Sequence, residues 1–463
     1  MSTTFLGGVI FVVVFAGIIL VHELGHFFAG RLLRIEVEEF GIFIPPRLLR
    51  LWRSKGSLVI GKKRVVIPRN TDLPFDHKTA VPRVVDATAD EVDGKLVLRS
   101  IKFAAAEDRQ PVPPPPAAAE KGQPARADEE QPVIKGSPKL NEETGAVRLS
   151  GPLTEVSPGT EFTLNWIPLG GFNRFKGEEN PNIPGGMAAA SPGKRILVLV
   201  AGAAMNLLTA VIVFMALFSQ TGVPDPTRTG ILQVMAGMPA EAAGFQAGDI
   251  LLSVAGESVQ STDQAIAIIN AHPGQEIIIT VQRGDETIAI AVTPQAADSD
   301  GLGRIGVALG NPYRPANSIW ETIPVSFEAT YGFTEQLLAF PGQLIAGTLT
   351  PEEAQVAGPR TIWNLFQQAV ARDTASSQTA APSYYTLWLI ISLTVSVGVF
   401  NLLPIPALDG GRIFMALIEI VFRRRIPAKY QMAINGIGFI ILFTLLGVFY
   451  IKDIISPAVI TLP

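Results

Sequence analysis

The stretch VHELGH, residues 21–26, carries two histidines and a glutamate inside an otherwise apolar segment. His22 and His26 are four positions apart, so on a helix both imidazoles face one side and can hold one divalent metal ion. Glu23 lies beside them, where a carboxylate can take a proton from an attacking water molecule. A plainer alternative is that the three side chains cap a membrane span near the headgroups. A carboxylate near membrane depth is costly, and this cost favours a functional role over simple capping.

A catalytic zinc ion usually has three protein ligands and one open position, so a third ligand is needed. Nearby glutamates fit poorly because they follow a charged helix end: Glu36, Glu38 and Glu39. Asp409 is a better candidate, since NLLPIPALDGGR places it directly after two prolines that interrupt a helix. Broken backbone at membrane depth persists only where protein or a water-filled cavity surrounds it. Without the histidine motif, Asp409 would be interpreted as an ordinary turn residue.

The composition is that of a membrane protein. Of 463 residues, 48% are hydrophobic and only 17% are charged, which is unusual for a soluble protein. The net charge of −4 and the lack of a basic arm argue against nucleic acid as a partner. There is no cysteine, so disulfides and thiolate metal sites are excluded and any metal must be held by His, Asp or Glu.

Four apolar stretches are long enough to cross about 30 Å of hydrocarbon. They cover residues 5–24, 196–218, 385–403 and 434–451. Lys and Arg gather after the first stretch, before the second and between the third and fourth, so these three loops are expected in the cytoplasm. Both termini and the segment between the second and third spans are then extracytoplasmic, and the histidines lie near the cytoplasmic face. The arginines at 423–425 are interpreted as topology determinants that face anionic lipid.

The loops differ in character. Residues 56–160 are polar and rich in Pro and Ala, a composition that predicts a partly disordered insert, unable to bury a core, with a few short strands. Residues 228–310 instead show the compact order of a strand, a short helix, a strand, a longer helix and two paired strands. His77 and His272 lie in a polar insert and before a Pro-Gly turn, so both are expected to be solvated.

Several of these stretches resemble the site-2 protease family of intramembrane zinc metalloproteases, in the bacterial branch that cleaves anti-sigma factors and signal peptides. HELGH on the first span, NLLPIPALDGG at the end of the third, and the core GFQAGDILLSVAG, which looks like a bacterial PDZ domain, carry the resemblance. The stretch FTLNWIPLGGFNRFKGEEN is similar to the membrane-associated β-hairpin of the family. The implied fold is a polytopic α-helical membrane protein with four transmembrane helices, that hairpin, and an inserted extracytoplasmic PDZ-like α+β domain.

The resemblance also implies roles for individual residues. His22, His26 and Asp409 would hold one catalytic Zn²⁺, and Glu23 would be the general base. Asn401 would donate a hydrogen bond to the substrate backbone or to the oxyanion. Where family members commonly have Pro after the Gly of the second span, this chain has Ala203, followed by Asn206.

The implied activity is regulated intramembrane proteolysis in the bacterial inner membrane. The substrates would be single-span membrane proteins, such as anti-sigma factors and signal-peptide remnants, cleaved within or near the transmembrane segment. The PDZ-like domain would bind a C-terminal substrate peptide or filter substrates by size. A different interpretation is a membrane-anchored PDZ scaffold with a non-catalytic metal site, which zinc content and cleavage of a single-span reporter would distinguish.

These expectations divide the chain into successive parts. They are 1–55 (first transmembrane helix with HELGH and its cytoplasmic flank), 56–160 (cytoplasmic insert), 161–192 (membrane-associated β-hairpin region), 193–220 (second transmembrane helix), 228–310 (PDZ-like domain), 311–383 (extracytoplasmic linker with amphipathic helices), 384–412 (third transmembrane helix with LDG) and 431–452 (fourth transmembrane helix).

Overall fold

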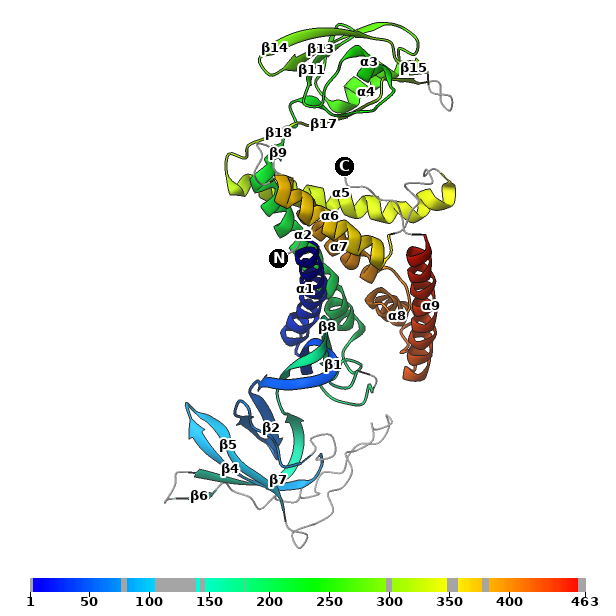
Figure 1. Cartoon of the computed structure of the whole chain (residues 1–463). Helices are drawn as coiled ribbons and strands as arrows, with labels where there is room; N and C mark the ends of the chain where they lie inside the picture. Colours follow the sequence, from blue (N-terminus) through cyan, green and yellow to red (C-terminus); the bar gives the residue numbers. More distant parts are fainter. Residues whose placement is uncertain are drawn as a thin grey trace, which may run out of the picture. The chain divides into compact units, whose positions relative to one another are not determined.

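The computed structural model describes residues 3–75, 81–104, 139–141, 146–178, 180–296, 302–347, 357–376 and 383–456. The chain forms two compact units (Figure 1). The first contains Met1–Leu207, Gly347–Thr386 and Leu393–Pro463, and the second contains Leu208–Ala346 and Leu387–Ser392.

Four helices in the described part of the chain are long and apolar enough to cross a membrane, as the sequence predicts. They are α1 (Thr3–Leu32), α2 (Pro192–Thr221), α7 (Tyr385–Leu402) and α9 (Ala428–Ile455). The third apolar stretch ends at Leu402, and after the two prolines a separate helix, α8 (Asp409–Phe422), begins. This break matters because Asp409 is the first residue of the new helix.

In the first unit, α6 (Pro359–Ser376) packs against α1. Phe11 of α1 makes edge contacts with Trp363 and Phe366 of α6, with ring centroids 5.4 and 5.6 Å apart. The start of α6 is also held by α9, because Asp453 accepts hydrogen bonds from the backbone N–H groups of Arg360 and Thr361. A carboxylate at a helix start stabilises the unpaired N–H groups there.

A four-armed sheet lies next to α1, built from β1 (Val37–Arg53) and β8 (Glu161–Phe175). Both strands bend back on themselves, and the pairing of single residues with two partners shows this. Phe40 pairs with both Phe162 and Asn173, and Thr163 pairs with both Gly41 and Arg50. The arms therefore alternate in the order 171–175, 37–42, 161–165 and 47–53. The region 161–192, expected as a β-hairpin region, contains the strand β8, which ends at Phe175. Its partner arms come from β1, in the segment expected as the cytoplasmic flank of the first span.

The chain between β1 and β8 forms a closed barrel. Its strands are β2 (Gly56–Ile60), β3 (Lys63–Ile67), β4 (Val84–Val92), β5 (Lys95–Phe103) and β7 (Ala146–Ser157), with β6 (Lys139–Asn141) paired to β7. The order β2-β3-β5-β4-β7 closes because β7 pairs back to β2. β3 and β5 are parallel, whereas the other pairs are antiparallel.

The barrel corrects the expectation that residues 56–160 cannot bury a core. Alternate residues of the strands point inward and form one cluster, made up of Leu58, Ile60, Val65, Ile67, Val85, Ala87, Ala89, Leu98, Val147, Leu149, Leu153 and Val156. The polar residues that dominated the composition occupy the other face, as period-two alternation requires. Residues 105–138 and 142–145, which include most of the Pro/Ala-rich run, and His77 lie outside the described residues.

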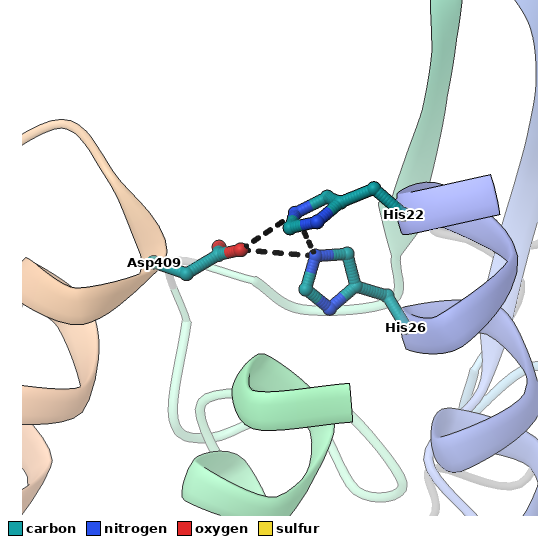
Figure 2. A group of neighbouring side chains, drawn as sticks. All are labelled: His22, His26 and Asp409. Carbon is teal, nitrogen blue, oxygen red and sulfur yellow. Dashed lines mark hydrogen bonds and ion pairs between the residues drawn. The ribbon is translucent and has the colours of Figure 1, made fainter. Parts of the chain in front are cut away.

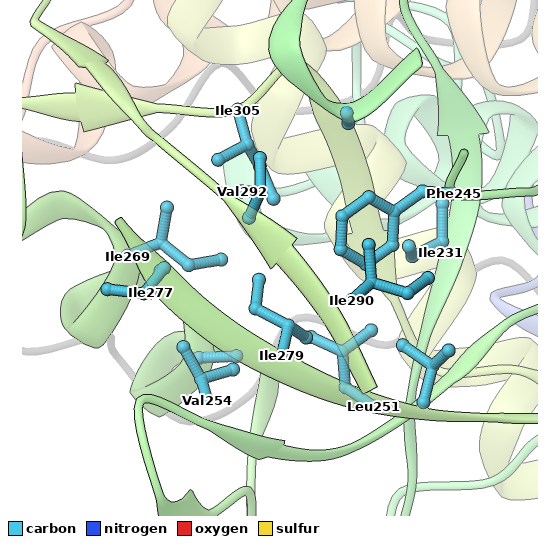
Figure 3. Packing of buried hydrophobic residues seen from close by; sticks show 13 residues of the cluster. Ile231, Phe245, Leu251, Val254, Ile269, Ile277, Ile279, Ile290, Val292 and Ile305 are labelled. Carbon is cyan, nitrogen blue, oxygen red and sulfur yellow. The ribbon is translucent and has the colours of Figure 1, made fainter. Parts of the chain in front are cut away.

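The second unit contains the PDZ-like domain. Its elements are β10 (Thr229–Val234), α3 (Pro239–Ala243), β11 (Ile250–Val254), β12 (Glu257–Ser258), α4 (Thr262–Asn270), β13 (Ile277–Arg283), β14 (Glu286–Val292) and β17 (Val307–Gly310). The sheet order is β14-β13-β11-β10-β17, which leaves β17 at an edge. Figure 3 shows the packing of its aliphatic core around Phe245, Ile279 and Ile290. Arg283 donates two hydrogen bonds of 2.7 Å to the buried Asp249 carboxylate.

Short ribbons and a long helix complete this unit. β9 (Val223–Pro224) pairs with β18 (Tyr313–Arg314), and β15 (Gln295–Ala296) pairs with β16 (Gly303–Arg304). α5 (Ile319–Ala346) follows, and together with α6 it occupies much of residues 311–383. His272 is half-buried, and its Nδ1 donates to the carbonyl of Ile268 at 2.7 Å.

The barrel core generates a test of its own. We predict that Leu58→Ala, at a position with 0% exposure, lowers the free energy of barrel opening by about 2–5 kcal/mol, since it leaves a cavity. Val92→Ala, at a position that is 50% exposed, should change it by less than about 0.5 kcal/mol. Hydrogen–deuterium exchange in β3 and β7 of the full-length protein measures both values. Unchanged protection in Leu58→Ala would contradict the closed barrel.

Candidate metal centre

Three ligand atoms from two distant helices converge at the end of α1. Asp409 Oδ2 lies 3.0 Å from His22 Nε2 and 3.1 Å from His26 Nε2, and the two Nε2 atoms are 3.1 Å apart. Figure 2 shows both imidazoles, one turn apart on α1, pointing toward the carboxylate of α8. Both histidines are buried, so the group is largely protected from bulk water.

The triangle has the size and chemistry of a zinc site. Tetrahedral ligands at about 2.0–2.1 Å from a zinc ion lie roughly 3.3 Å from one another, close to the spacing of these atoms. Two imidazole nitrogens and one carboxylate oxygen form a common donor set for catalytic zinc and leave one coordination position open. The residues present therefore fit the ion.

Hydrogen bonds from the other ring nitrogens favour this arrangement. His26 Nδ1 donates to the carbonyl of Val198 on α2 at 2.8 Å, which leaves the lone pair of Nε2 directed at the triangle. Asn206 lies 3.5 Å from His22 Nδ1, and its Oδ1 is buried without a partner among the described residues. Half a turn of that amide lets Oδ1 accept a hydrogen bond from Nδ1–H, which leaves Nε2 of His22 free as a ligand as well.

Two glycines allow α1 and α2 to approach closely enough for these contacts. A Cβ on Gly202 would lie 2.5 Å from the His26 ring and 2.8 Å from the His22 ring. A Cβ on Gly25 would lie 2.2 Å from the carbonyl oxygen of Ala201. Because no real Cβ tolerates such distances, any side chain at Gly202 would push the imidazoles out of the triangle.

The broken segment after α7 fixes the position of Asp409. Ala407 has φ of 76°, a left-handed conformation that is costly for a residue with a side chain. Gly410 packs directly on the carbonyl of Leu403, where a Cβ would lie at 1.9 Å. On the α9 side, Gly438 leaves room for Pro406, which a Cβ would meet at 2.3 Å. The aspartate is therefore held by backbone packing on both sides.

Glu23 is close to the metal ligands without being one of them. It lines a cavity of about 280 Å³ together with His22, His26 and Asp409. Asn173, on the outer arm 171–175 of the four-armed sheet, donates from Nδ2 to Glu23 Oε2 at 2.8 Å and to the Glu23 carbonyl at 2.6 Å. This double contact fixes both the backbone and the side chain of Glu23.

Asn401 lines the same cavity, but its amide is engaged elsewhere. Its Nδ2 donates to the carbonyl of Val397 on its own helix at 3.0 Å. The glutamates rejected as ligands have other partners: Glu36 pairs with Lys176, and Glu39 is buried in the four-armed sheet, where it accepts hydrogen bonds from Arg47 and Thr163.

Sequence reasoning missed several residues of this site. Asn206 was noted only for its place in the family pattern, although a polar side chain within an apolar span is itself a signal of function. Asn173, Val198 and Gly202 carry no such signal, because their importance comes from neighbours far away in the chain.

The glycine contact gives a prediction. We expect Gly202→Ala to raise the zinc dissociation constant at least about tenfold, because the added methyl displaces both imidazoles. Gly17→Ala is the matched control on α1, since a Cβ there meets nothing within 4 Å. Competition with a chelating dye, on the purified full-length protein, measures both constants. Equal affinity in the two variants would contradict the close packing of Gly202 on the histidines.

The chain is similar to known metalloproteases over more than half of its length. Residues 10–58 and 148–445 match Peptidase family M50. A Clostridium perfringens protein named as a zinc metalloprotease is 32% identical over 64% of this chain and 84% of its own length. Zinc metalloprotease RasP of Oceanobacillus iheyensis is 30% identical over 58% of this chain and 61% of that relative. Metalloprotease MmpA of Caulobacter vibrioides is 28% identical over 59% of this chain and 77% of that relative.

Two solved structures match a smaller part. The PDZ domain of an SdrC-like protein from Listeria monocytogenes is 25% identical, with a TM-score of 0.17, and covers 18% of this chain and 87% of that chain. The corresponding domain from Listeria innocua is 26% identical, with a TM-score of 0.16, and covers 18% of this chain and 92% of that chain.

The relatives and the family match together identify the enzyme class. Four apolar helices make the chain a multi-pass membrane protein, and the relatives are zinc metalloproteases. The resemblance seen in the motifs is thereby confirmed: the chain belongs to Peptidase family M50, the site-2 protease family, and is a zinc metalloprotease of the membrane.

Proposed function

We propose that this protein is an intramembrane zinc endopeptidase that cuts single-span membrane proteins within or near their transmembrane segment, in regulated intramembrane proteolysis. One zinc ion would be held by His22, His26 and Asp409. The observation that carries the proposal is the meeting of His22 and Asp409, 387 positions apart, at 3.0 Å beside a cavity that Glu23 also lines.

The proposed roles follow from where each side chain lies. When bound, zinc supplies a Lewis acid that polarises the scissile carbonyl and makes water acidic near neutral pH. Glu23 would accept the proton of the attacking water and then give it to the leaving amine, as a general base and acid. Asn173 would keep the Glu23 carboxylate facing the cavity, so that no rotamer search is needed at each turnover.

Asn401 is proposed to contact the substrate. In the absence of substrate its amide donates to the carbonyl of Val397 on its own helix. A single side-chain rotation releases the amide from this contact. Turned into the cavity, the N–H group would donate to the substrate backbone or to the oxyanion that develops during attack.

A substrate helix hides its peptide bonds in hydrogen bonds, so it must be unwound before cleavage. The arm 171–175 is one of the two outer arms of the four-armed sheet, and among the described residues no further strand pairs with its outer side. We infer that an extended substrate segment adds to this arm, because strand addition grips the main chain with little demand on sequence. Asn173 belongs to the same arm, which links substrate capture to Glu23.

The PDZ-like domain offers a similar edge. β17 lies at the end of its sheet and is followed along the chain by β18 and then by α5. We propose that the C-terminal peptide of a substrate binds along β17. The alternative proposal is that the same domain excludes substrates that are too large.

The Glu23 carboxylate gives the decisive prediction. We expect Glu23→Gln to keep zinc bound but to lower cleavage of a single-span reporter by about 10²–10⁴-fold, since the amide cannot accept the proton. Zinc content by elemental analysis and cleavage in proteoliposomes measure the two effects. Glu155→Gln, on the barrel surface, is the matched control and should cleave normally.

A companion variant separates positioning from proton transfer. Asn173→Ala removes the hydrogen bond to Glu23 but no ligand, so zinc should stay bound and kcat should fall about 10–100-fold.

Cleavage at the normal rate in Glu23→Gln would exclude Glu23 as the base and would refute the proposed mechanism. Loss of zinc in the same variant would instead make Glu23 a structural residue.

The basic clusters support an orientation. We propose that the loops after the first span and before α9 are cytoplasmic, that both termini and the PDZ-like domain are extracytoplasmic, and that the zinc site lies near the cytoplasmic face of the bacterial inner membrane.

A reporter enzyme tests this orientation. Alkaline phosphatase fused after Val223, just beyond α2, should be active, because it is active only outside the cytoplasm. A fusion at Lys429 should be inactive and serves as the control. The reverse pattern would overturn the orientation and leave the zinc chemistry untouched.

A further inference from the structure

A second cavity in the same unit, of about 410 Å³, is separate from the one beside the histidines. It lies between α2, α8, the start of α9 and the segment from Glu178 to Ala188, and none of its lining residues borders the first cavity. Nothing in the proposed proteolysis uses it.

The lining of this cavity has more arginines than carboxylates. Glu419, which is buried, pairs with Arg195 and also accepts from the Ile426 N–H and from Gln431. Arg412 pairs with Glu178 at 2.7 Å.

Arg425 is different, because its two Nη atoms donate only to the backbone carbonyls of Ala188 and Ala189, at 3.1 and 3.2 Å. Within the described residues no carboxylate pairs with it. The lining therefore keeps one uncompensated positive charge, and that charge attracts an anion.

Unused hydrogen-bonding atoms also border the cavity. Arg195 Nε and Asn435 Oδ1 are both buried, and neither has a partner among the residues that the structure describes. A buried polar atom without a partner is costly, so these two positions favour a polar occupant. Half a turn of the Asn435 amide offers a donor in place of the acceptor.

The surroundings of the cavity are those of a lipid-facing site. α2 and α9, two of the candidate spans, both begin beside it, at Pro192 and Ala428. Large exposed apolar side chains lie one helical turn beyond lining positions on the same faces of α8 and α9. Ile420 follows Ala416 and Phe439 follows Asn435, and they are 48% and 53% exposed. An occupant with one anionic end and a long apolar body would satisfy both parts of this surface.

We propose that this cavity binds the phosphodiester headgroup of an anionic phospholipid, with Arg425 as the main contact and the acyl chains along α8 and α9. The single negative charge of a lipid such as phosphatidylglycerol matches the one unpaired arginine. The bound lipid would brace α8, whose first residue is Asp409, against the start of α9.

Lipid retention by the full-length, zinc-loaded protein tests the proposal. The protein is delipidated in detergent and mixed with equal amounts of dioleoyl phosphatidylglycerol and dioleoyl phosphatidylcholine, and native mass spectrometry counts the bound molecules. We expect one phosphatidylglycerol per chain, retained about tenfold better than phosphatidylcholine. Arg425→Gln should weaken its binding about tenfold, which is the usual effect of losing one charged hydrogen bond.

Two further variants make the result specific. Arg424→Gln removes the same charge from the same run of arginines but does not border the cavity, so it should change retention less than twofold. Ala428→Phe leaves every arginine in place and fills the cavity, so it should also lose the lipid.

Three results would overturn the proposal. One is equal retention of the two lipids, and another is an equal loss in Arg425→Gln and Arg424→Gln, because either would indicate general surface electrostatics. The third is displacement of phosphatidylglycerol by inorganic phosphate or by a peptide from a cleaved reporter, because then the occupant is a free anion or a product. Zinc content, measured on each variant, verifies that the site at Asp409 remains intact.

Discussion

The structure depends on bringing two imidazoles and one carboxylate to within about 3 Å of one another, away from bulk water. Three ligand atoms that face each other repel unless a cation joins them, so the surrounding protein must hold them in place. It does so with backbone, because Gly25 and Gly202 let α1 and α2 touch, and Gly410 lets α8 begin directly against the broken segment. Side chains at these positions would separate the ligands before any chemistry began.

Around this centre three residues orient the side chains of the site. Val198 orients His26 through its carbonyl, Asn206 faces His22, and Asn173 fixes Glu23. The groups that orient the histidines therefore come from α2, and the side chain that holds Glu23 comes from the four-armed sheet. At the second cavity Arg425 donates only to backbone carbonyls, and Arg195 Nε has no partner among the described residues, so the proposed lipid headgroup would have both to bind.

The barrel is joined to the site through the four-armed sheet. The family match omits residues 59–147, which contain most of the barrel, so this part is additional to the shared family core. β2 leaves the arm 47–53 and β7 returns to the arm 161–165, and Ser54 N donates to Thr160 O where the two connections meet. Closing the barrel therefore fixes the spacing of two arms, and the same sheet carries Asn173 at its other side.

Local patterns in the sequence determined the four apolar helices, the element order of the PDZ-like domain and the pairing of His22 with His26, because each depends on residues close together in the chain. The interrupted helix after the third span made Asp409 a candidate third ligand, and the family resemblance implied that it joins them. Only the tertiary structure decided the interleaved arms of β1 and β8, the barrel closed by β2 and β7, and the contacts of Asn173 and Arg425. These features arise from strands and helices that meet across more than ninety positions, where neither periodicity nor composition carries information about the partner.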